Sequence, residues 1–159
     1  MVAGNPDKIA FIIEKVSDWS SCGCTNGILY LYLNGKQYPQ ELRTVTIDGE
    51  LYSMLSGNSP LVAMPVNEKI FSLSPQHTAE YIYELACENG NYTYSVPFQE
   101  LEDTGYYLFM VCSNSCCRFV LAHSTGADSV DYTDEIVISN NELSQITDKI
   151  KKFRESLMA

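Results

Sequence analysis

Six cysteines and two histidines are the residues of this chain whose side chains could support catalysis. A thiolate activated by a neighbouring imidazole is a strong nucleophile, and His123 follows the cysteine-rich stretch 112–117 closely. Such a pair also needs a third, orienting group and donors for an oxyanion, and no motif here supplies them. His77 falls in the first turn of a predicted helix, an ordinary place for a solvated imidazole. We therefore predict that the protein has no catalytic residues and is not an enzyme.

Metal binding is the second chemistry that the cysteines could support. They form a pair, Cys22-x-Cys24, and a cluster, Cys112-x3-Cys116-Cys117. Structural zinc sites usually show paired C-x(2–4)-C knuckles, and neither histidine lies at ligand spacing from a cysteine pair. We expect reduced structural thiols and no metal or other cofactor. The alternative, a cytosolic metal- or redox-responsive protein that uses these five cysteines, stays open.

The charge of the chain is strongly negative and unevenly distributed. Asp and Glu total 20 against 10 Lys and Arg, for a net charge of −10. Residues 1–148 hold 19 acids and 6 bases, since four bases, Lys149, Lys151, Lys152 and Arg154, crowd into the last eleven residues. Such a body repels nucleic acid and anionic membranes and attracts basic proteins. We expect neither nucleic acid nor membrane as a partner.

Two dense runs of carboxylates could form a binding surface. The first contains Glu100, Glu102 and Asp103, and the second contains Asp128, Asp131, Asp134 and Glu135. Charge runs are usually solvated loops, and that interpretation competes with a docking surface for a basic partner. The spacing of these carboxylates matches no calcium-binding loop.

Local sequence signals predict the elements that would position these residues. Alternating or apolar runs predict strands at residues 8–16, 28–33, 35–39, 44–47, 69–73, 92–96, 106–112, 117–122 and 135–139. Asn34-Gly35 predicts a tight type I′ turn. Helices are expected at about residues 49–56, 75–88 and 141–157, with Asp48 and Ser74 as N-caps and a capping box from Ser139 to Glu142. On the last helix, positive charge in the final turns is favourable in itself and does not require a nucleic-acid partner.

These elements predict a single α+β domain over residues 1–159. Its mainly antiparallel sheet would be covered on one face by the two longer helices, about 75–88 and 141–157. The N-terminus shows no basic and apolar signal-peptide pattern, and no apolar run is long enough to span a bilayer. We therefore expect a cytoplasmic protein.

The first forty residues resemble a known family. Gly4-Asn5-Pro6-x-x-Ile9-Ala10-Phe11-x-Ile13-Glu14-x-Val16-x-x-Trp19, followed by Asn26-Gly27-x-Leu29 and Leu33-Asn34-Gly35-x-x-Tyr38-Pro39, is similar to the start of immunity protein 42, a group of bacterial polymorphic-toxin immunity proteins. The cysteine-rich segments 20–24 and 112–117 are not part of that pattern. The resemblance implies an antitoxin of the contact-dependent growth inhibition type, whose partner is the C-terminal domain of a cognate toxin, often a nuclease.

A nuclease must present Lys and Arg to phosphates, so an acidic inhibitor can cover its cleft. Tight binding also needs aromatic anchors among the acids. The predicted toxin-binding residues are Glu100, Glu102, Asp103, Tyr106, Asp128, Asp131, Tyr132, Asp134 and Glu135.

Overall fold

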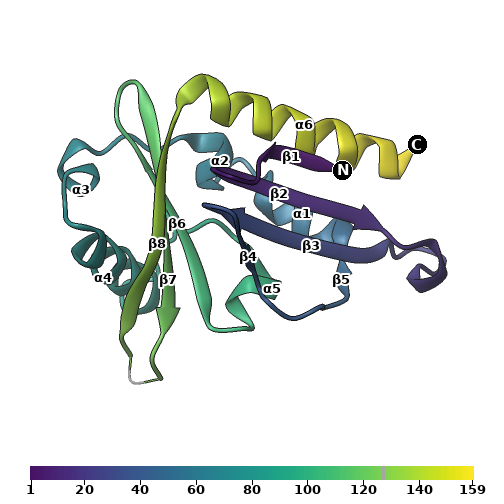
Figure 1. Ribbon diagram of the computed structural model, residues 1–159, viewed down its shortest axis with the longest axis horizontal. Helices are drawn as coiled ribbons and strands as arrows, with labels where there is room; N and C mark the ends of the chain where they lie inside the picture. The colour runs from purple at the N-terminus through teal and green to yellow at the C-terminus, as the bar shows by residue number, and fades with distance from the viewer. Residues whose placement is uncertain (127) are drawn as a thin grey trace.

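The described residues form two antiparallel sheets and six helices, shown in Figure 1. The computed structural model describes residues 1–126 and 128–159. The strands are β1 (Val2–Asn5), β2 (Ile9–Lys15), β3 (Asn26–Leu33), β4 (Lys36–Tyr38), β5 (Val45–Thr46), β6 (Tyr106–Cys112), β7 (Cys116–Ser124) and β8 (Val130–Ser139). The helices are α1 (Ile47–Met54), α2 (Pro60–Ala63), α3 (Glu68–Phe71), α4 (Pro75–Cys87), α5 (Gln99–Glu102) and α6 (Asn140–Met158), with one 3₁₀ turn, η1 (Ser17–Trp19).

The α+β class, the antiparallel pairing and the two longer helices, α4 and α6, are confirmed. The strands, however, divide between two sheets. The first has the order β1-β2-β3-β4, with β5 also paired to β3, and the second has the order β6-β7-β8. Each long helix covers a different sheet, because α4 packs against β7 and β8 whereas α6 lies along β1 and contacts α1 (Figure 1).

Strand β6 lies between two hydrophobic cores, which explains its unbroken apolar sequence. Leu108 and Met110 belong to the larger core, which also holds the apolar side chains of β2, β3 and α6. Phe109 and Val111 point the other way and pack with the buried face of α4. A strand covered on both faces has no solvent side on which polar residues would be favoured.

Several local predictions are confirmed. Asn34 and Gly35 have φ angles of 50° and 78°, and a type I′ turn requires positive φ at both positions. Ser74 accepts a hydrogen bond from the backbone N–H of His77 at the start of α4. Ser139 and Glu142 form the complete capping box at the start of α6.

Two predicted strands and one predicted cap are wrong. Residues 69–73 belong in part to α3, whose first turn is capped by Asn67 through a hydrogen bond from the N–H of Ile70. Residues 92–96 form no strand but make one isolated bridge, Ser95 to Phe109. Helix α1 begins at Ile47, before the predicted cap Asp48. In each case the local pattern was short, so tertiary contacts decided the outcome.

The expectation that all cysteines are reduced is also wrong. Cys112 and Cys117 face each other across β6 and β7 and form a disulfide. Directly opposed positions in a hairpin bring Cβ atoms close together, and the sequence spacing alone did not reveal this register. Cys22, Cys24 and Cys87 are exposed thiols, and Cys116 is a partly buried one.

Candidate functional site

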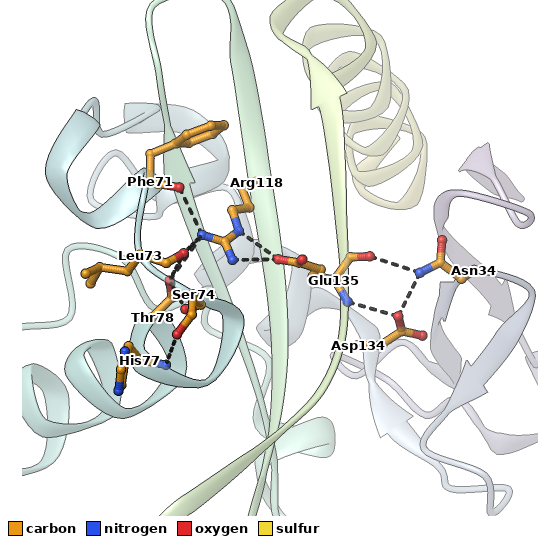
Figure 2. Close-up of polar contacts among 9 residues, drawn as sticks. All are labelled: Asn34, Phe71, Leu73, Ser74, His77, Thr78, Arg118, Asp134 and Glu135. Carbon is orange, nitrogen blue, oxygen red and sulfur yellow. Dashed lines mark hydrogen bonds and ion pairs between the residues drawn. The ribbon is translucent and has the colours of Figure 1, made fainter.

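The second acidic run does not form a solvated loop, because most of it lies on β8. Figure 2 shows Glu135 facing Arg118, which is buried and only 6% exposed. Glu135 Oε2 lies 2.7 Å from both Nε and Nη2 of Arg118. The remaining guanidinium nitrogen donates to the carbonyl oxygens of Phe71 and Leu73, at 2.9 and 2.8 Å. Glu135 is therefore occupied in neutralising a buried cation.

Asp134 is also held by an internal contact. Its Oδ1 accepts a hydrogen bond of 2.8 Å from Nδ2 of Asn34, in the turn between β3 and β4 (Figure 2). The same amide nitrogen donates to the carbonyl oxygen of Glu135 at 3.0 Å. Asn34 thereby links the first sheet to β8 of the second. Asp134 and Glu135 contribute to the joint between the sheets more than to a free anionic surface.

The first acidic run forms α5 and the residue that follows it. Glu100 pairs with Arg43 at 2.8 Å. Its backbone N–H and that of Gln99 donate to the two carboxylate oxygens of Glu50, at 3.1 and 3.2 Å. Glu50 is buried, and burial raises the pKa of its carboxyl group. Glu102 and Asp103 remain exposed and, with Glu50 and Glu100, line a cavity of about 570 Å³.

Tyr106 and Asp131 lie on the two outer strands of the three-stranded sheet, at the same level. His123 on β7 pairs in register with Tyr106 on β6 and with Asp131 on β8. The Tyr106 ring lies 4.6 Å from the His123 ring and 5.3 Å from the Tyr38 ring, measured between centroids. Tyr132 is 37% exposed, and its backbone N–H donates to the side-chain oxygen of Gln76.

Asp128 meets an acidic row on α4 that the sequence reasoning missed. Glu80, Glu84 and Glu88 follow one another at intervals of four residues, which places them on one face of a helix. With Asp128 and Tyr83 they line a cavity of about 480 Å³ between α4 and the start of β8. Burial, followed by a hydrogen bond with the Cys87 thiol, raises the pKa of Tyr83 to about 12. The four-residue spacing was the signal that could have found this row.

The five cysteines considered as one metal site do not converge. Cys22 and Cys24 follow η1 at one end of the molecule, whereas residues 112–117 form the β6–β7 hairpin at the other (Figure 1). Among residues 1–126 and 128–159, no three His, Cys, Asp or Glu side chains gather in a way that could hold a metal ion.

The distribution of charge is the feature that these groups share. Residues 70–148 hold twelve acids and one base, Arg118, which is buried and paired with Glu135. Nine of these acids have no ion-pair partner among the described residues. We set aside Asp134, which accepts from Asn34, and Asp148, which lies on α6. We call the other seven, all exposed, the acidic face: Glu80, Glu84, Glu88, Glu102, Asp103, Asp128 and Asp131. Such a surface can attract a basic partner. None of the described helices is both long enough and apolar enough to cross a membrane.

Comparisons with known proteins agree with this picture of the fold. The structure is similar to the crystal structure of CdiI from Burkholderia dolosa, with a TM-score of 0.74 and 24% sequence identity over 96% of this chain and 99% of that chain. At 24% identity, this similarity shows that the two chains share a fold. No curated protein matches the sequence. The family described as immunity protein 42 matches residues 1–153, which is nearly the whole chain. The chain therefore belongs to the immunity protein 42 family.

Proposed function

We propose that this immunity protein neutralises a cognate toxin by placing its acidic face against a basic surface of the toxin's C-terminal domain. Family membership supports the antitoxin role. The choice of surface is supported by the acidic face, whose seven exposed acids have no ion-pair partner among the described residues. This unneutralised charge is the observation that carries the proposal.

The same charge supports a nuclease as the class of toxin. A nuclease binds phosphates with Lys and Arg, so its active-site cleft is positively charged. Carboxylates that approach this cleft accelerate association and disfavour partners without such a cleft. We therefore assign a basic nuclease domain as the target.

Aromatic residues beside the acids would supply the affinity that surface charge alone does not. Tyr132 follows Asp131 on β8, Tyr106 lies across His123 of β7 from Asp131, and Tyr83 lines the cavity with Asp128. Half-buried rings of this kind lose little conformational freedom on binding and bury a large area. Glu100, Asp134 and Glu135 act indirectly in this proposal, since their contacts to Arg43, Asn34 and Arg118 hold α5 and β8 in place.

The test is a binding measurement with the toxin domain encoded beside the gene for this protein. We expect a dissociation constant of about micromolar or tighter, with an association rate that falls as salt is added. A dissociation constant no tighter than about millimolar would contradict the antitoxin proposal. A toxin that binds tightly but degrades neither DNA nor RNA would contradict the nuclease assignment alone.

A further inference from the structure

The turn formed by residues 21–24 fixes the backbone of two cysteines, Cys22 and Cys24. Ser21 and Cys24 exchange two backbone hydrogen bonds, of 3.2 Å from the N–H of Ser21 and 3.0 Å from that of Cys24. Gly23, between the cysteines, has a φ of +90°, which a glycine adopts without strain. The two thiols, Cys22 and Cys24, are therefore separated by a single residue of defined conformation.

The base of this turn is closed by further hydrogen bonds. The hydroxyl of Ser20 donates to the carbonyl of Val16 at 3.0 Å and accepts from the N–H of Asn26 at 3.1 Å. The side-chain amide of Asn26 donates to the carbonyl of Trp19 at 2.7 Å. A loop fixed in this way loses little further entropy when it binds a ligand.

Both thiols are accessible and unbonded. Cys22 and Cys24 are exposed, and no atom of another segment lies within 4 Å of the position that a Cβ would take on Gly23. The structure joins Cys112 to Cys117 but leaves Cys22 and Cys24 as separate thiols. Two neighbouring thiols that are not joined to each other can instead be bridged by a metal ion.

We propose that Cys22 and Cys24 together bind one soft monovalent cation, Cu(I), as a two-coordinate dithiolate. Both thiols release their protons, and each sulfur donates an electron pair to the ion, which gives a complex of net charge −1 without any redox change. Thiolates favour Cu(I), whereas zinc requires four ligands. Among the described residues no third His, Cys, Asp or Glu joins this pair. A site with two sulfur ligands therefore favours Cu(I), which two ligands can satisfy, over zinc.

This site is separate from the acidic face. It follows η1 at the end of the molecule opposite α4 (Figure 1). If Cys22 and Cys24 do not bind Cu(I), the antitoxin proposal is unaffected. If the protein does not bind the toxin, the Cu(I) proposal is unaffected. The chain's single tryptophan, Trp19, is 41% exposed and lies in η1, so its fluorescence can report on the turn.

The test is an anaerobic titration of the full chain with Cu(I) against a coloured Cu(I) chelator. We expect one equivalent to bind, with a change in Trp19 fluorescence. Cys22→Ser and Cys24→Ser should each weaken binding by at least about 100-fold, since the second ligand no longer adds its chelate contribution. Cys87→Ser, which removes an exposed thiol on α4 that has no cysteine beside it in the sequence, is the matched control and should leave the affinity unchanged.

Two results would overturn the site. The first is unchanged Cu(I) affinity in both turn variants while their circular dichroism shows a normal fold. The second is binding of Zn(II) by the wild type as tightly as Cu(I), because a two-ligand site does not satisfy zinc. X-ray absorption of the Cu(I) complex should find two sulfur neighbours, and three or more would contradict the two-coordinate assignment.

Discussion

The guanidinium of Arg118 is surrounded by groups from three separate parts of the chain. It pairs with Glu135 on β8, donates to carbonyl oxygens of Phe71 and Leu73 before α4, and donates to the hydroxyl oxygen of Thr78 on α4. A buried cation of this kind is tolerated only when nearly all of its donors are satisfied. Arg118 therefore fixes α4 and β8 to β7 at one point.

Arg118→Ala should lower the free energy of unfolding by about 3 kcal/mol, because it leaves Glu135 and two carbonyl oxygens without their donor. Urea denaturation measures this change. Glu135→Gln, which keeps an acceptor at the same place, should cost less than Arg118→Ala. Equal losses in the two variants would show that the charge pair, not the carbonyl contacts, dominates.

The lowered pKa of Glu142 predicts how the stability of the folded protein depends on pH. Hydrogen bonds from the Lys8 ammonium, then from Ser139, lower the pKa of its carboxyl group to about 2. The folded state thus favours the ionised form, so the stabilisation is complete above the unfolded pKa, about 4.5, and is lost as pH falls toward 2. Glu142→Gln should flatten the stability profile over this window. A wild type and variant with parallel profiles below pH 4.5 would contradict the assignment.

Single residues also show where sequence reasoning ended. Asp131 and Glu135 stand in the same acidic run, yet Asp131 belongs to the acidic face and Glu135 neutralises Arg118. The two residues differ in the contacts that distant segments make with them. These contacts cannot be predicted from the pattern of charges along the chain.

At the scale of elements, α6 shows how much a local signal can determine. Ser139 supplies a cap, and the apolar stripe that includes Leu143, Ile146 and Ile150 is buried. Both were predictable because caps and helical periodicity depend on neighbours within four residues. Strands β6 and β7 of the second sheet were also predictable, as were residues 135–139 of β8. The first half of β8 and the separation of the strands into two sheets were not, since pairing between distant strands leaves no local mark.

Ser139→Ala should destabilise the protein by about 1 kcal/mol, because the N–H of Glu142 loses its acceptor. Thermal unfolding followed by circular dichroism measures the change. Ser144→Ala, the same substitution at an exposed position inside α6, serves as control. It should be neutral or slightly stabilising, since alanine is the better helix former. A similar loss in both variants would mean that the cap itself contributes nothing.

At the scale of the whole molecule, the placement of charge predicts the kinetics of toxin binding. Glu84→Lys combined with Asp131→Lys should slow association with the toxin by about tenfold at low salt and weaken its salt dependence. Stopped-flow fluorescence measures both quantities. Glu14→Lys combined with Asp18→Lys changes the net charge equally, but at the opposite end of the molecule, and should have a smaller effect. Equal slowing by the two pairs would mean that net charge, and not the acidic face, governs association.

The opposed placement of α4 and the end of α6 has a mechanical consequence. Lys149, Lys151, Lys152 and Arg154 lie near the C-terminus (Figure 1). Glu80 and Glu84 lie on α4, and Glu88 directly follows it, on the other side of the molecule. The chain thus carries a permanent electric dipole moment. In the field of a positively charged protein, this dipole experiences a torque that orients α4 toward the partner before the two surfaces touch. A larger fraction of encounters then has the orientation needed for binding.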